Sequence, residues 1–377
     1  MLPGGERYEL RGGAVLGTGA TAATSRIAYA AAHVVADPLA ENVPGARAAL
    51  DWDATLAFRH HLWRHGLGVA EAMDTAQRGM GLDYSAVRNL VRRSASEARS
   101  VGGRIVAGVA TDQLDGPATV DEVLAAYREQ LADVADSGAV PVIMCSRHLA
   151  SAARSPDDYV RVYSTLLSEV DGPVLLHWLG SMFDPALAAY WGTMDLDEAA
   201  DTVLSLLKAY ASKVDGIKMS LLDKDFEIKF RRRLPGGVRM YTGDDFNYPE
   251  LIAGDDHGYS DALLGVFAAI APAVAPALAE LDKGATDGFR ALLDPTVPLA
   301  RHLFGAPTQY YKTGIVFLSW LSGHQNHFTM VGGLQSGRSV THLARLLVLA
   351  DEAGLLPHAD LAAARARSFF AVAGVPQ

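Results

Sequence analysis

The sequence predicts one eight-stranded α/β barrel followed by a helical extension. Short apolar segments typical of buried strands alternate with longer segments that have helical periodicity. Eight strand segments precede residue 269, and eight is the number of strands that closes such a barrel. Polar residues follow nearly every predicted strand, as at the catalytic face of α/β barrels. We therefore expect a barrel over residues 1–268 and a helical extension over residues 269–377 that packs on it.

The predicted strands are short, apolar and mostly bounded by turn residues, and the helical crossovers between them favour a parallel sheet. They comprise residues 26–35, 67–72, 104–110, 140–144, 173–176, 214–220, 238–241 and 259–264.

Capping residues and apolar stripes predict the helices between the strands. Asp51 can cap a first helix, which Gly66 terminates. A later helix carries apolar residues at steps of four and three, and another has Pro156 in its first turn, where proline is favoured. The predicted helices comprise residues 51–64, 83–101, 119–137, 156–170 and 195–212.

The chain beyond Ala268 is predicted to be helical, with breaks at Gly284, Pro295 and Gly332-Gly333. A run of 18 apolar residues over 262–279 only just reaches the length of a membrane span, and it contains two prolines. We interpret this run as a buried strand that continues into a helix. The extension exceeds what a barrel needs, and we expect it to contribute to a subunit interface.

Composition restricts the classes of partner and the compartment. The net charge of -10 disfavours nucleic acid and anionic membranes, which need a basic surface, and it favours a small-molecule partner. Cys145 is the only cysteine, so no intrachain disulfide can form. The polar N-terminal residues do not resemble a signal peptide, and we expect a cytoplasmic protein.

Lys218 is the candidate nucleophile. It lies in the strand segment over residues 214–220, and a lysine at the mouth of a barrel can sit in a dry pocket that lowers its pKa. The chain has 7 lysines and 26 arginines, and the first lysine is Lys208. Because a guanidinium cannot form a Schiff base, a lysine in a chain that otherwise uses arginine indicates a need for an amine.

Other polar residues after the strands are candidates for binding and proton transfer. His177 follows the strand next to Lys218 and is the preferred general acid or base, although a structural histidine would fit as well. Arg147 suits a carboxylate or phosphate, or an ordinary surface ion pair. Asp244 and Asp245 would hold the amine or bind hydroxyls, or else form a turn and a helix cap. The remaining candidates for substrate binding are Asp74, Thr75 and His148.

A metal or a phosphate-bearing cofactor has weaker support. His324 and His327 lie three apart on a predicted helix, and Asp255-Asp256-His257 is a second cluster, but neither has the glutamate and third ligand of a strong zinc motif. The glycine-containing segment 16–20 precedes the first strand, whereas a dinucleotide fingerprint would follow it. We expect neither a metal nor a cofactor.

Two motifs resemble the dihydrodipicolinate synthase and N-acetylneuraminate lyase superfamily of class I aldolases. They are Gly216-Ile217-Lys218-Met219-Ser220 and, about two dozen residues later, Thr242-Gly243-Asp244-Asp245. The resemblance extends weakly over residues 27–356, with 51–68 as a first helix and 307–323 as a helix of the C-terminal bundle that places Lys312 where the superfamily often has a lysine. It implies an eightfold barrel with a three-helix tail, a Schiff base on Lys218 and a homo-oligomer, either a dimer or a tetramer.

The departures from this superfamily concern its substrate-binding residues. The Gly-Thr-Thr-Gly-Glu loop that holds a 2-oxo acid falls on residues 74–78, where only Thr75 is retained and Asp74 would repel a carboxylate. The tyrosine that relays protons after the fourth strand falls near Ser146-Arg147-His148, and His177 stands where a second tyrosine is common. The chain therefore resembles a divergent branch for which pyruvate is not the expected substrate.

The preferred hypothesis is a lyase or aldolase that cleaves or forms a carbon-carbon bond in a polyhydroxylated keto or 2-oxo compound through an imine on Lys218. One alternative is a metal-dependent sugar isomerase, epimerase or hydrolase that uses Asp74, Asp244 and Asp256. Another is a barrel without catalytic activity, because a fold does not determine a function.

Overall fold

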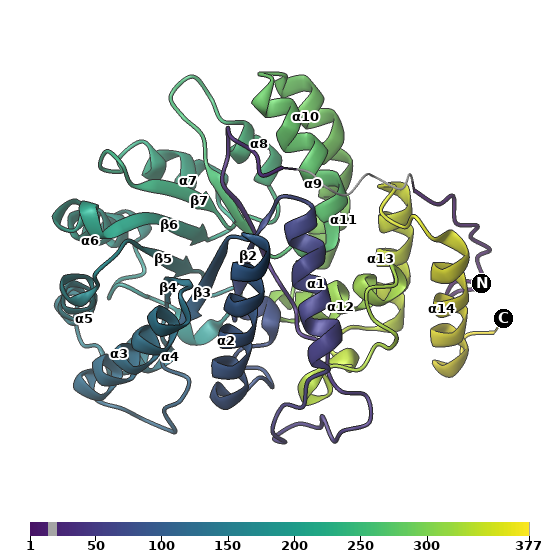
Figure 1. Ribbon diagram of the computed structural model, residues 1–377, viewed down its shortest axis with the longest axis horizontal. Coiled ribbons are helices and arrows are strands. Elements are labelled where there is room, and N and C mark those ends of the chain that lie inside the picture. Colours follow the sequence, from purple (N-terminus) through teal and green to yellow (C-terminus); the bar gives the residue numbers. More distant parts are fainter. Residues whose placement is uncertain (14–20, 377) are drawn as a thin grey trace.

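Eight parallel strands form a closed barrel in sequence order (Figure 1). The computed structural model describes residues 1–13 and 21–376, so the glycine-containing segment 16–20 lies outside the described residues. The strands are β1 (Ala28–Ala31), β2 (Gly68–Glu71), β3 (Ile105–Val109), β4 (Val140–Met144), β5 (Val174–Leu179), β6 (Val214–Ser220), β7 (Arg239–Thr242) and β8 (Asp261–Leu264). β1 pairs with both β2 and β8, which closes the sheet. The predicted fold class is confirmed.

Helices surround the barrel and separate successive strands (Figure 1). They are α1 (Trp52–Arg64), α2 (Tyr84–Val101), α3 (Val120–Ser137), α4 (Arg147–Ala152), α5 (Pro156–Glu169), α6 (Leu196–Ala209), α7 (Lys224–Arg231), α8 (Tyr248–Ala253) and α9 (Phe267–Asp282). The predicted caps are present: the Asp51 side chain accepts from the Ala54 amide, and Thr119 forms a reciprocal capping box with Glu122.

The first strand is shorter than predicted, because side chains of α1 take over the backbone hydrogen bonds that a longer strand would make. Arg59 donates to the carbonyl oxygen of His33, and the Val35 amide donates to Thr55 Oγ1 at 3.0 Å. Arg59 also forms a buried ion pair with Glu71 at the end of β2. These contacts hold the segment after β1 against α1, and the ion pair fixes the end of β2.

The apolar run over residues 262–279 is divided between β8 and α9, as interpreted from the sequence. The non-helical residue inside α9 is Ile270, with φ -117° and ψ 15°, two residues before Pro272. Within the described residues, no helix has the length and apolar character needed to cross a membrane.

The chain after α9 forms five further helices beside the barrel: α10 (Thr286–Leu293), α11 (Val297–Leu303), α12 (Tyr311–Leu321), α13 (Val340–Glu352) and α14 (Ala359–Val372). Residues between α12 and α13 are irregular apart from a 3-10 segment, Val331–Ser336. The prediction that His324 and His327 share a helix was therefore wrong, because α12 ends at Leu321.

The N-terminal segment lies against this extension (Figure 1). Tyr8 and the backbone amides of Arg11 and Gly12 donate to the carboxylate of Asp351 in α13. A continuous apolar cluster extends from the barrel helices into the extension. The division into a barrel over residues 1–268 and an extension over residues 269–377 stays a prediction.

Candidate active site

Lys218 lies near the C-terminal end of β6, in register with His177 of β5 and Tyr241 of β7. Its side chain is buried, and within the described part of the chain its Nζ makes no hydrogen bond or ion pair that would compensate its charge. Burial lowers the pKa of Lys218, while the carboxylates of Asp74 and Asp245 act in the opposite direction. The amine is therefore free at a lower pH than an ordinary lysine.

The backbone of Gly243 passes directly beside this lysine. A Cβ built at residue 243 would lie 2.7 Å from Lys218 Cε and 2.2 Å from Ser220 Oγ, so only glycine fits there. The Gly243 amide donates to the Met219 carbonyl oxygen at 2.7 Å. The two sequence motifs of the candidate site are thus packed against each other at this residue.

A small cavity of about 10 Å³ is lined in part by Lys218. Polar groups of Asp74, Thr75, Ser220 and Asp245 line it, and the aromatic rings of residues 183, 304 and 311 complete its wall. Thr75 Oγ1 and the Tyr311 hydroxyl lie 2.8 Å apart. The helical extension therefore covers the site and keeps water away from the amine.

The two adjacent aspartates have different environments. Asp244 accepts hydrogen bonds from the backbone amides of Phe246 and Asn247, which matches the turn interpretation. Asp245 lines the lysine cavity and accepts from the Val266 amide at 2.8 Å. Burial raises the pKa of Asp245 to about 7, with Lys218 acting in the opposite direction. Asp245 can therefore carry a proton near neutral pH, whereas Asp244 has a structural role.

Asp74 and Thr75 begin a 3-10 turn, Asp74–Ala76, directly after β2. This turn is anchored through Gln77, whose φ is 66° and whose Nε2 donates to the Val331 carbonyl oxygen at 2.8 Å. No hydrogen bond to the Asp74 carboxylate is present within the described ranges, 1–13 and 21–376. Asp74 lines both the lysine cavity and the larger mouth cavity described below, so the two cavities adjoin at this residue.

His177 is fully buried below Lys218, and its Nε2 lies 3.1 Å from Ser220 Oγ. Burial, and secondarily the charge of Lys218, holds the pKa of His177 well below its usual value, so the ring is neutral. His177 lines neither cavity, whereas Ser220 lines the lysine cavity. His177 can therefore reach a substrate proton only through the Ser220 hydroxyl.

A larger cavity of about 300 Å³ opens at the ends of β3 and β4. Its two cations are already paired: Arg147 with Asp184, and Arg78 with Asp112. Arg78 also donates to Gly108 O, and this network is buried. The hydroxyl and imidazole groups of Thr111, Ser146 and His148 complete the polar lining. The mouth thus offers mainly hydrogen-bonding groups.

Lys312 is a second buried lysine that sequence reasoning assigned no role. It lies in the first turn of α12, and its Nζ is 3.3 Å from Met80 Sδ. Burial lowers its pKa to about 8, against the attraction of Asp74. The scarcity of lysine that singled out Lys218 applies equally to Lys312 and would have identified it.

The residues of the metal hypothesis are dispersed. Asp256 and His257 lie in an exposed loop between α8 and β8. Across the described residues, no group of three or more His, Cys, Asp or Glu side chains is arranged to hold a metal ion.

The fold is shared with solved structures of the dihydrodipicolinate synthase family. A putative dihydrodipicolinate synthetase from Pseudomonas aeruginosa is 16% identical with a TM-score of 0.66, over 87% of this chain and 99% of that one. A prophage protein of the same family from E. coli, solved with pyruvate, is 13% identical with a TM-score of 0.68, over 88% and 100%.

The 4-hydroxy-tetrahydrodipicolinate synthase from Methylacidiphilum fumariolicum is 15% identical with a TM-score of 0.65, over 91% of this chain and 98% of that one. No curated protein sequence matches the chain. The family of proteins of unknown function DUF993 matches residues 4–375. The chain belongs to the DUF993 family, and its fold is that of the dihydrodipicolinate synthase barrels.

Proposed function

We propose that this protein is a Schiff-base-forming lyase that cleaves or forms a carbon-carbon bond in a hydroxylated keto compound. The observation that carries the proposal is the Lys218 amine, buried at the barrel mouth without a bonded partner among the described residues. An uncompensated buried amine is costly for a fold, and strongly perturbed groups of this kind concentrate at functional sites.

The chemistry follows from the groups around this amine. The free amine of Lys218 attacks the substrate carbonyl carbon, and loss of one water gives an imine. The protonated imine accepts the electron pair of the bond between the α and β carbons as that bond breaks, and the hydroxyl on the β carbon loses its proton so that this carbon leaves as a carbonyl. The resulting enamine takes up a proton on carbon, and water then hydrolyses the imine and restores the amine.

The Ser220 hydroxyl is the proposed carrier of the substrate hydroxyl proton. It lines the lysine cavity, and the neutral ring of His177 can accept its hydrogen bond at Nε2. Asp245, with a pKa of about 7, is a second group in this cavity that can hold a proton.

The proposed substrate class follows from the charges at the mouth. Both arginines there form ion pairs with aspartates, and the carboxylate of Asp74 lines the cavity next to Lys218. A substrate carboxylate would meet Asp74 without a free arginine to offset the repulsion. Hydroxyl groups match the hydroxyl, imidazole and carboxylate groups of this mouth.

Borohydride trapping tests the proposal. The protein is incubated with dihydroxyacetone or with pyruvate, reduced, digested and mapped by mass spectrometry. We expect an adduct on Lys218 that forms more readily with dihydroxyacetone, and no adduct on the other buried lysine, Lys312. Lys218→Met should abolish the adduct.

A panel of further hydroxylated ketones and aldehydes extends this test. If no compound of the panel leaves an adduct on Lys218, the protein does not work through an imine there. Preference for pyruvate over every hydroxylated compound would keep the imine and overturn the substrate class.

A further inference from the structure

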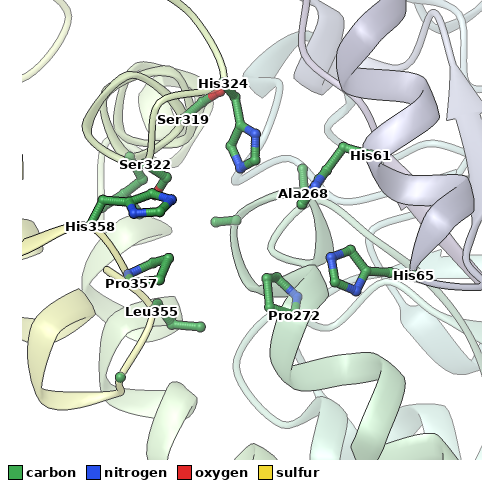
Figure 2. A pocket seen from close by; sticks show the side chains of 13 residues that line it. His61, His65, Ala268, Pro272, Ser319, Ser322, His324, Leu355, Pro357 and His358 are labelled. Carbon is green, nitrogen blue, oxygen red and sulfur yellow. The ribbon is translucent and has the colours of Figure 1, made fainter. Parts of the chain in front are cut away.

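A second cavity, separate from the lysine site, lies between the barrel and the extension (Figure 2). Its volume is about 190 Å³, which is large beside the roughly 30 Å³ that one water occupies in the liquid. His61 of α1 and His65, directly after that helix, form one wall, and His324 and His358 extend from the opposite side (Figure 2). The start of α9, with Ala268 and Pro272, lies between these walls.

The polar groups of this cavity lack partners. Among the described residues, none of the four imidazoles has a side-chain hydrogen bond. His65 Nδ1 and Ser319 Oγ are buried and unpaired, and these side chains are only 3% and 6% exposed. A buried polar atom without a partner costs about 1–3 kcal/mol. Two such atoms around one cavity indicate a site that is completed by a ligand.

The charge of the lining restricts the class of ligand. No Asp, Glu, Lys or Arg is among the described residues that line the cavity. Burial lowers the pKa of His61 to about 2 and that of His324 to about 4, so both rings are neutral at physiological pH. The cavity therefore attracts neither anions nor organic cations, and its histidines are not arranged around a metal position.

Hydroxyl groups are the best match for this lining. A neutral imidazole has one donor and one acceptor, and a serine hydroxyl can do both, as can each hydroxyl of a ligand. The apolar atoms of Ala268, Pro272, Leu318 and Leu355 would contact the carbon chain between such hydroxyls. We propose that the cavity between α1, α9 and α12 is a binding site for a small neutral polyhydroxy compound, a polyol of three to about six carbons.

Two elements connect this site to the lysine. α9 begins directly after Val266, whose amide donates to Asp245 in the lysine cavity. Ser319 lies on α12, the helix that begins with Tyr311 and so covers the lysine cavity. A ligand in the second cavity contacts both elements and can act on the site as an effector.

Histidine-selective ¹⁵N nuclear magnetic resonance tests the site. The full-length protein is titrated with glycerol, erythritol and xylitol, with sodium sulfate and zinc chloride as probes for an anion site and a metal site. We expect saturable shifts of the His61, His65 and His324 signals with at least one polyol. His257, which is exposed, serves as an internal reference.

Two variants separate a specific site from general solvent effects. Ser319→Ala removes one oxygen atom, and His65→Phe fills part of the cavity without donors or acceptors. We expect each to weaken polyol binding at least tenfold, while His257→Ala leaves it unchanged. Lys218→Ala should bind the polyol normally, so this test is independent of the imine chemistry.

The proposal is overturned if no polyol produces saturable shifts, or if Ser319→Ala and His65→Phe bind as tightly as the wild type. Tight binding of sulfate that strengthens at low pH, or of zinc, in place of the polyols would also overturn it.

Discussion

Two buried lysines share one carboxylate at the mouth of this barrel. Asp74 is the strongest attracting charge for both Lys218 and Lys312, although neither lysine forms an ion pair with it within bonding distance. The charge of Asp74 raises the pKa of each amine, whereas burial lowers it. The nucleophilicity of Lys218 at a given pH therefore depends on Asp74. This residue falls in the segment that the sequence comparison matches to the carboxylate-binding loop of the dihydrodipicolinate synthase superfamily.

Replacing Asp74 should change the pH dependence of imine formation. In Asp74→Asn the attracting charge is lost, so the pKa of Lys218 falls further and more of the amine is free at low pH. We expect the profile of borohydride trapping against pH to shift to lower pH. Asp184→Asn is the control, because Asp184 lines the mouth cavity without lining the lysine cavity. Equal profiles for Asp74→Asn and the wild type would show that Asp74 does not act on the amine.

His177 should affect turnover without affecting the imine. In His177→Phe the Ser220 hydroxyl loses its acceptor at Nε2, and we expect turnover to fall by about two to four orders of magnitude, the range of general acid or base catalysis. Trapping on Lys218 should persist, and Ser220→Ala should give a similar loss.

A full loss in Ser220→Ala with near-full activity in His177→Phe would restrict proton transfer to the serine. Full activity in His177→Phe with loss in His148→Ala would instead assign the transfer to the β4 loop.

At the residue scale, the sequence predicted part of the surroundings of Lys218. Lys218, Asp74, Thr75 and Asp245 do lie together, because Lys218 is near the end of β6, the other three follow strands, and parallel strands end at the same face. The sequence could not predict that Tyr311 completes the cavity, since it lies 93 residues after Lys218 along the chain and no periodicity links the two.

At the element scale, α7 supports the end of β7 through one buried carboxyl group. Glu227 accepts from Thr242 Oγ1 at 3.0 Å and from Ser260 Oγ at 2.7 Å. Thr242 Oγ1 in turn accepts from the Asp244 amide at 3.1 Å. The turn that contains Gly243 and Asp245 is therefore stabilised by the buried carboxyl group of Glu227.

Glu227 should make stability fall as pH rises. Burial raises its pKa from 4.5 to about 8, so its contribution to stability is complete below pH 4.5 and is lost as pH rises through 8. Glu227→Gln cannot ionise and does not lose this contribution. The difference in free energy of unfolding between Glu227→Gln and the wild type should therefore rise by roughly 3 to 5 kcal/mol, in favour of the variant, between those pH limits. Urea unfolding at pH 5 to 8 measures the difference.

Glu250→Gln, which removes an exposed ion pair with Lys224, is the matched control and should show no such trend. A constant difference between Glu227→Gln and the wild type across this pH range would contradict the prediction.

Strands and long helices were predictable because their signals are local. The β4 and β6 bounds match the predicted ranges, and Asp51 and Thr119 cap helices as expected. The short helices α4, α7 and α8 have only 6 to 8 residues and lack a full apolar stripe. The early end of β1 depends on contacts with Arg59 and Thr55 that only the folded chain brings together.

At the scale of the whole molecule, the helical extension and the barrel meet at the lysine cavity. Phe304 and Tyr311 stack with their ring centroids 4.2 Å apart, and both line the cavity that holds Lys218. The burial that lowers the pKa of Lys218 is therefore due in part to residues outside the barrel. The extension has a direct effect on the proposed chemistry, in addition to the subunit contacts expected from the sequence.

Removing the Tyr311 ring should raise the pKa of Lys218. In Tyr311→Ala the cavity opens to water, the burial that opposes the charged amine is reduced, and the pKa moves back toward its ordinary value of 10.5. Less free amine is then present at neutral pH, so we expect trapping to slow at pH 7 and its profile to shift to higher pH. Tyr311→Phe keeps the ring and loses only the hydrogen bond to Thr75, so its profile should match the wild type.

The loss of a buried ring also costs about 3–5 kcal/mol of stability, so circular dichroism must first show that Tyr311→Ala is folded. A wider opening admits the carbonyl probe more easily, which raises the trapping rate equally at every pH, whereas a raised pKa changes the position of the profile. The position of the profile on the pH axis thus distinguishes easier entry of the probe from a change in the pKa of Lys218. If Tyr311→Ala is folded and its profile has the wild-type position, the Tyr311 ring has no part in lowering the pKa of Lys218.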